Sequence, residues 1–250
     1  MKNILKISFL FLIIFTSCQK ISEQQYTLKF YGDAYEDIGY SVAILSDGYV
    51  IAGQVEELKR ENSFITGRNK NMVIIKTGWS GNVVWKVSTG GKFNDLGSKI
   101  YQNTDGSLIC VGTYTDSLSV TTNVTDVYIV KISATGTVAW TKKYGGAGNQ
   151  TGKDVVKTPD GYMVLGSTDI ASLSGAGSTG NIAGNSDIFL LKIKENGDSI
   201  ESFAYGYPGN DVGAVIKPDQ SGNFVVFGTT EQSDPGQNKN NLLFVRINPV

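Results

Sequence analysis

Short apolar runs recur along this chain, and glycine or polar residues separate them. One phrase returns four times: a turn pair, Asp-Gly in three copies and Ser-Gly in the last, followed by an apolar run that ends on glycine. The copies occupy residues 47–53, 105–112, 160–166 and 221–228. A polar segment and a second apolar run follow each copy, and the second run ends on Lys76, Lys131, Lys192 or Arg246. Runs this short, bounded by turn residues, predict β-strands.

The rest of each unit supplies two more strands. A third run follows a glycine turn and ends in Thr-Gly-Gly, Tyr-Gly-Gly or Tyr-Gly-Tyr, and a fourth leads into the next turn pair. Each unit is therefore predicted to be four antiparallel strands, A to D, with the turn pair between A and B. Strands B and C are apolar at almost every position, so both faces of each sheet should be covered. Repeats of this kind predict an all-β fold, a four-bladed β-propeller.

The two ends of the repeat array complement each other. The fourth unit has strands A, B and C at 214–217, 224–227 and 242–247, but no strand D. Residues 26–33, YTLKFYGD, match the end of strand D in the second unit. We therefore predict that the N-terminal strand, residues 26–32, completes the last blade beside 242–247 and closes the ring. A longer array cut short, or two chains that pair their open ends, are the alternatives.

Three further residues have predicted places in such a core. Trp85 and Trp140 occupy equivalent positions on strand D, where we expect them to pack between blades rather than to form a carbohydrate platform. Cys110 lies within an apolar run and is expected to be buried.

The amino terminus resembles an export signal. Lys2 and Lys6 precede an apolar run that is too short to span a membrane as an ordinary helix. The stretch Phe15-Thr16-Ser17-Cys18 resembles the bacterial lipobox, which implies lipidation of Cys18 after removal of residues 1–17. A simple secretory signal or an uncleaved anchor are the alternatives. Gln19 favours the outer membrane, with the protein facing the periplasm or the cell surface, attached to the membrane through its lipid alone.

These boundaries give the predicted domain organisation. Residues 1–17 are a lipoprotein signal peptide, residues 18–25 a tether and residues 26–250 a single propeller domain.

Charge and composition remove several classes of function. The formal net charge is −1, and loss of the two signal lysines makes it −3, so no nucleic-acid partner is predicted. The chain has no histidine, which weakens catalytic-triad and zinc-hydrolase hypotheses. We predict no catalytic residue and no cofactor.

Loop lengths predict a sided molecule. In each unit the B-to-C and D-to-A connections emerge on one face, which we call the loop face, and the short turns lie on the other. The four B-to-C connections are long: residues 54–70, 113–125, 167–186 and 229–240. Within the first of them, residues 55–64 are expected to form one or two helical turns. Long polar loops on a rigid scaffold are common binding sites, so this face is the predicted binding surface.

The D-to-A connections carry one polar residue each at matching positions: Asp37, Asp95, Gln150 and Asp211. The three acids are candidate metal ligands, because a ring of carboxylates at a channel mouth could hold a cation. Alternatively, each acid binds backbone amides in its own turn. The sequence favours the second interpretation, and no metal site is predicted.

The pattern resembles a group of exported bacterial repeat proteins, often Bacteroidota lipoproteins. Their units read Asp-Gly-Gly-Tyr-Ile-x-x-Gly, then Asp-(x)4-Lys, then Gly-(x)3-Trp-(x)3-Tyr-Gly-Gly. The resemblance covers about residues 26–248. This chain departs from the pattern in its single Gly after Asp47, Asp105 and Asp160, in Ser221 and in Glu201, where Trp is expected. The resemblance implies a propeller and assigns no catalytic residue.

Three functions are compatible with these features. The favoured hypothesis is a lipid-anchored, non-catalytic scaffold of the cell envelope that binds a protein or a glycan through the loop face. The alternative is a carbohydrate-active enzyme that uses two carboxylates among Glu36, Asp37, Asp95 and Asp211. The third is a purely structural module.

Overall fold

The computed structural model describes residues 28–32, 35–61, 63–116, 124–146, 148–169, 178–181, 186–234 and 237–248. The chain divides into two compact units, residues 1–30 and Tyr31–Val250. Of the first unit, only residues 28–30 are described, and Cys18 lies outside the described residues. The domain boundaries drawn from the sequence therefore stay predictions. Within the described residues there is no helix with the length and hydrophobicity to cross a membrane.

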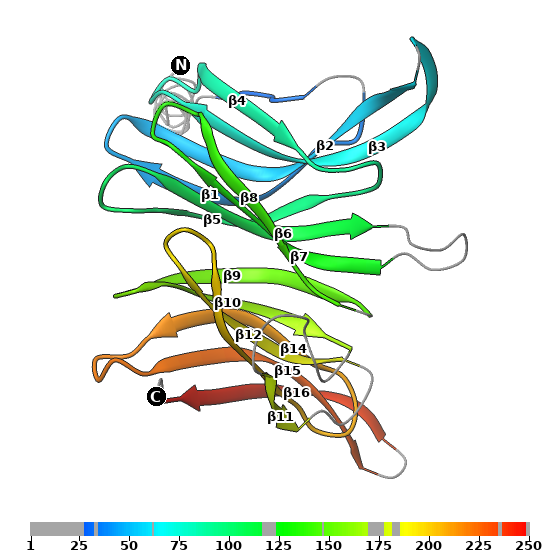
Figure 1. Cartoon of the computed structure of the whole chain (residues 1–250), viewed down its shortest axis with the longest axis vertical. Helices are drawn as coiled ribbons and strands as arrows, with labels where there is room; N and C mark the ends of the chain where they lie inside the picture. Colours follow the sequence, from blue (N-terminus) through cyan, green and yellow to red (C-terminus); the bar gives the residue numbers. More distant parts are fainter. Residues whose placement is uncertain are drawn as a thin grey trace, which may run out of the picture. The chain divides into compact units, whose positions relative to one another are not determined.

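The second unit is built from four antiparallel sheets, as the repeats predicted (Figure 1). The first sheet contains β1 (Ile38–Leu45), β2 (Gly48–Glu61), β3 (Phe64–Thr77) and β4 (Val83–Thr89). The second contains β5 (Leu96–Gln102), β6 (Leu108–Asp116), β7 (Val124–Ile132) and β8 (Val138–Tyr144). The third contains β9 (Gln150–Thr158), β10 (Gly161–Thr168), β12 (Asp187–Lys194) and β13 (Ser199–Tyr205), with β11 (Ser178–Asn181) beside β13. The fourth contains β14 (Asp211–Pro218), β15 (Phe224–Asp234) and β16 (Gln237–Ile247).

Two of the predicted long loops are instead extended hairpins. Strands β2 and β3 stay paired from Tyr49 and Thr77 out to Glu61 and Phe64, and Ser63 in the tight turn has a φ of 71°. The expected helical turns within residues 55–64 are therefore wrong, because β2 continues to Glu61. Strands β15 and β16 extend in the same way to Asp234 and Gln237. In the third sheet, β11 adds a short parallel pairing with β13 that the sequence did not predict.

Three apolar cores join the sheets in chain order. The first core contains Val50, Met72 and Ile74 of the first sheet and Cys110 and Tyr128 of the second. The second core joins the second sheet to the third, and the third core joins the third sheet to the fourth. Each sheet therefore has a forward face, toward the next sheet in the chain, and a backward face, toward the preceding one. Alternation along each strand assigns successive side chains to opposite faces.

The tryptophans and the cysteine lie where the sequence predicted. Trp85 packs against the first core and Trp140 against the second. Each tryptophan covers the C-to-D turn of the next sheet, because a Cβ on Gly136 would come within 2.8 Å of Trp85 and one on Gly197 within 3.1 Å of Trp140. The Cys110 side chain is fully buried, and burial raises the pKa of its thiol above the usual range.

Residues 28–32 of the N-terminal segment do not form a strand, and residues 26 and 27 lie outside the described residues. Tyr31 packs against Val55, Val73 and Ile75 on the backward face of the first sheet. The pairing of residues 26–32 with β16 therefore stays a prediction, and the described fourth sheet has three strands.

Candidate functional site

The D-to-A turns of the loop face are held by buried polar side chains. Asp95, which is fully buried, accepts hydrogen bonds from the main-chain N–H groups of Gly91 (2.6 Å) and Thr115 (2.7 Å). These bonds join the turn to the end of β6. Burial raises the pKa of the Asp95 carboxyl, although the two N–H donors oppose the rise. This carboxylate has a structural role in its own repeat.

The equivalent residues of the other repeats make similar bonds. Gln150 accepts from Gly146 N at 3.1 Å and Asp211 from Tyr207 N at 2.5 Å, so both hold their own turns. Asp37 accepts from Glu56 N, within strand β2, at 3.1 Å. Asp95, Gln150 and Asp211 thus bind backbone amides of their own turns, as the second interpretation predicted, whereas this bond of Asp37 goes to the neighbouring strand. Among the described residues, no group of three or more acidic, cysteine or histidine side chains could hold a metal ion.

A second set of polar residues explains the glycine after each strand D. The side chains of Asn71, Asp126 and Asp187, at equivalent positions of β3, β7 and β12, fill the space beside that glycine. A Cβ on Gly145 would lie 1.6 Å from Asp126 Oδ1, and one on Gly206 would lie 1.5 Å from Asp187 Oδ1. The first glycine after strand D is therefore required by packing against a polar side chain, a role that the sequence alone did not indicate.

The β2–β3 hairpin brings cations onto aromatic rings of the D-to-A turns. Arg68 lies over the Tyr35 ring, with Cζ 4.1 Å from its centroid, and Lys59 Nζ lies 6.0 Å from the Phe93 centroid. Such contacts stabilise the hairpin by about 0.5–1 kcal/mol each at exposed sites. Lys70 also forms an ion pair with Glu36. One of the four acids considered for glycan hydrolysis is thus engaged in fixing the hairpin.

The tip of this hairpin is apolar and exposed. The side chains of Phe64 and Ile65 are 76% and 58% exposed. The neighbouring hairpin residues are charged, with Arg68 3.6 Å from Glu56. Figure 1 shows the β2–β3 hairpin extending beyond the rest of its sheet. This exposed apolar pair at the end of a polar arm is the candidate contact point of the loop face.

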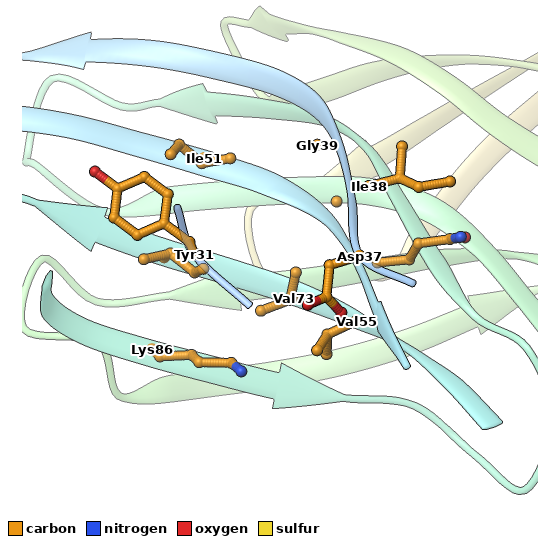
Figure 2. Close-up of a pocket in the computed structure, with 11 residues that line it drawn as sticks. Tyr31, Asp37, Ile38, Gly39, Ile51, Val55, Val73 and Lys86 are labelled. Atoms are coloured by element: carbon orange, nitrogen blue, oxygen red, sulfur yellow. The ribbon is translucent and has the colours of Figure 1, made fainter. Parts of the chain in front are cut away.

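A separate pocket lies on the backward face of the first sheet (Figure 2). Side chains of Ile51, Val55 and Val73 form its apolar wall, Tyr31 borders it, and Gly39 and Gly53 leave room within it. Asp37 and Lys86 are its charged residues. The pocket holds no cluster of nucleophile and base, and its lining is that of a packing surface.

The sequence analysis missed two features: the cation–aromatic contacts of the β2–β3 hairpin and the pocket on the backward face of the first sheet. The cation–aromatic contacts join residues far apart in sequence, so no local pattern indicates them. The pocket follows from the unpaired face of an end sheet, which only the packing order of the sheets shows.

No protein-family model matches the sequence, and comparison with curated proteins gives no significant match. The likeness to exported bacterial repeat proteins therefore stays a prediction from the motifs.

Proposed function

We propose that this protein is a non-catalytic binding scaffold of the bacterial envelope, with the four sheets as blades of a β-propeller. In this proposal residues 26–32 supply the fourth strand of the last blade, and Cys18 carries a lipid that anchors the protein at the outer membrane. The three cores between successive sheets support the propeller, because blades of a propeller pack face to face in chain order. The loop face binds a partner protein.

The exposed apolar tip of the β2–β3 hairpin is the observation that favours a protein over a glycan as the ligand. Phe64 and Ile65 lie on an arm that charged and cation–aromatic contacts hold in place. Buried aromatic and aliphatic anchors provide most of the binding free energy in protein–protein contacts. A glycan site would instead need open ring faces, whereas Arg68 covers Tyr35 and Lys59 lies over Phe93. A protein partner is the better fit.

The enzymatic alternative has no supporting observation. Asp95 and Asp211 are fully or almost fully buried and bind main-chain N–H groups, so a substrate would have to displace those bonds. The two carboxylates of a glycosidase must instead face the same substrate.

Site-specific photo-cross-linking in intact cells tests the proposed binding surface. A photoreactive residue at position 64 should give a discrete adduct with one protein, and the same residue at the exposed Thr135, in a turn on the opposite face, should not. The double substitution Phe64→Ser and Ile65→Ser should abolish the adduct formed from a second position on the hairpin, residue 68. Equal labelling from positions 64 and 135 would contradict the proposal.

Membrane attachment has its own test. Cys18→Ser should release the protein from the membrane fraction and remove its labelling by a radioactive fatty acid. Persistence of both in the variant would exclude anchoring through Cys18.

A further inference from the structure

The first and last sheets each leave one apolar face uncovered. On the first sheet, Val42 and Ile44 are 62% and 72% exposed on the backward face. On the fourth sheet, the exposed residues of the forward face are Phe227, Leu242 and Phe244, and Leu242 is 91% exposed. Among the described residues, no core cluster joins the first sheet to the fourth. Apolar surface of this kind on a stable protein marks an interface.

The equivalent residues of the other repeats show that the exposed apolar positions on these two faces are normally buried. Strand pairing aligns Val42 with Ile100, Val155 and Ile216, and all three counterparts are buried in the internal cores. Leu242 aligns in the same way with buried Met72, Val127 and Ile188. The forward face of the fourth sheet and the backward face of the first are thus the two partners of the next interface in the same series.

The pocket of Figure 2 matches the side chain that this interface would insert. At the first internal interface, Met72 lies over two glycines of the second sheet: a Cβ on Gly97 would meet Met72 Cγ at 3.0 Å, and one on Gly112 would meet Met72 Cε at 2.8 Å. The counterparts of those glycines, Gly39 and Gly53, line the pocket. At the second and third interfaces, a Cβ on the glycine equivalent to Gly39 would instead meet Val111 or Leu165, each at 2.6 Å. The side chains that would enter the pocket are therefore Leu242, the counterpart of Met72, and Phe227, the counterpart of Val111 and Leu165.

Tyr31 occupies the position that the last strand D residue of a preceding sheet takes at the internal interfaces. Tyr144, the last residue of β8, donates its hydroxyl to Gly197 O in the C-to-D turn of the next sheet. Tyr31 donates in the same way to Gly81 O, in the C-to-D turn of the first sheet, at 2.8 Å. Tyr31 therefore behaves as the end of a strand D from a preceding sheet. Among the strands that the structure describes, the fourth sheet is the one without a strand D.

We propose that a second copy of the chain covers both open faces, so that two chains form one ring of eight sheets in place of a four-bladed ring closed within one chain. The fourth sheet of each copy packs its forward face on the first sheet of the other, and its β16 pairs with the partner's residues 28–32. The inference rests on the propeller proposal and continues the interface that the three internal cores establish. A head-to-tail contact of this kind closes into a ring when the rotation permits it. The occupant is a second copy because the described residues of one chain form no core between these two sheets, whereas the first sheet of another copy offers the same surface that each internal interface uses.

An engineered disulfide distinguishes a ring closed by two chains from a ring closed within one chain. In each complete sheet, the counterparts of Phe244 and Lys29 lie directly opposite each other, as the pairs Ile74–Val87, Ile129–Lys142 and Leu190–Phe203. Lys29→Cys with Phe244→Cys should therefore form a disulfide between chains, which doubles the mass on a non-reducing gel. Lys29→Cys with Thr135→Cys is the control and should stay reduced. A disulfide within one chain would overturn the second copy but leave the propeller and its binding face intact, whereas no disulfide would overturn the strand pairing.

The assembly can also be tested without a covalent link. By sedimentation, the full chain should be a two-chain species, and Phe244→Glu should weaken association at least about 30-fold, as expected for a buried aromatic anchor. Phe64→Glu, on the hairpin tip, should leave the two-chain species unchanged. Circular dichroism checks that each variant folds, and Leu242→Gln replaces Phe244→Glu if that variant does not. A single-chain species at 100 µM wild-type protein, or a ladder of larger species, would overturn the proposal.

Mixing two defective chains provides a stringent check. Val42→Glu disables only the backward face and Phe244→Glu only the forward face. Each alone should be a single chain, and the mixture should contain a two-chain species because one intact interface remains. A mixture that stays single-chain would contradict pairing between copies.

Discussion

At the scale of single residues, the repeat depends on polar side chains buried against glycine. Asp126 Oδ1 is buried without a hydrogen-bond partner and lies where a Cβ of Gly145 would stand. Gln150 Oε1 is also close to that glycine. A buried acceptor without a donor costs free energy, so this position is a point where small changes have large effects.

Gly145→Ala should lower the free energy of unfolding by about 1–3 kcal/mol, the usual cost of overpacking a well-packed site. Gly78→Ala is the matched control, because nothing lies within 4 Å of a Cβ at Gly78. Urea unfolding of both variants measures the difference. Equal stability of the two variants would contradict the proposed role of Asp126 in fixing the glycine.

Asp126→Asn should make stability less dependent on pH. Burial raises the pKa of Asp126, Asp116 adds to the rise and Lys143 opposes it. A carboxyl whose pKa is higher in the folded state than its ordinary 3.8 stabilises the fold at low pH, and this contribution is lost as pH rises through the raised value. The variant should therefore gain stability over the wild type as pH increases from 3 to 7, in melting experiments. A constant difference over that range would contradict this interpretation.

The converse substitution tests the same position in the first sheet. Asn71 is the counterpart of Asp126 and donates to Glu57 at 2.8 Å. Asn71→Asp would replace that bond by repulsion from Glu57 and Asp95, so it should destabilise the fold by about 1–3 kcal/mol at pH 7 and less at pH 4. Melting curves at both pH values measure the effect, and no change would exclude a shared role for the two positions.

At the scale of the elements, aromatic residues of strand D lock one sheet to the next. Trp140 covers Gly197, and Trp85 covers Gly136 and donates to Ala134 O at 3.4 Å. The third repeat has Glu201 at this position, where it binds Lys192 at 3.2 Å. In the described part of the following sheet, the last strand is β16, and the position of Glu201 faces no described C-to-D turn.

Trp140→Ala should cost about 3 kcal/mol of unfolding free energy, since the cavity would open between two sheets. Trp79→Ala is the control: Trp79 is exposed and makes one edge contact with Tyr49, at 5.2 Å between ring centroids, so about 1 kcal/mol is expected. Denaturant titrations compare them. A loss no larger for Trp140 than for Trp79 would exclude the locking role.

The elements also show how far sequence patterns lead. Glycine turns and apolar runs predicted the four sheets, the strand order and the places of Trp85 and Cys110, because these follow from local periodicity. The hairpin extensions were missed, since β2 continues through charged residues such as Glu56 and Glu57 that indicate a loop by composition. The cation–aromatic contacts and the pocket depend on tertiary packing, which periodicity does not contain. The closing strand and the lipid anchor stay predictions.

At the scale of the whole molecule, the two open apolar faces make the melting temperature depend on association between copies of the chain. A ligand that binds only the folded state raises the melting temperature as its concentration rises, and a second copy acts as such a ligand. The wild-type melting temperature should therefore rise with protein concentration from 1 to 100 µM, measured by calorimetry. Phe244→Glu should melt at a concentration-independent and lower temperature. A wild-type value that does not change with concentration would contradict assembly between copies.

The pairing of strands that are neighbours in sequence has a consequence for biosynthesis. Each sheet can form as soon as its own segment has been synthesised, and it then packs on the sheet made before it. In every folding intermediate, the forward apolar face of the most recently formed sheet is exposed. Partly folded forms of the chain are therefore expected to aggregate through that surface until the last sheet is covered.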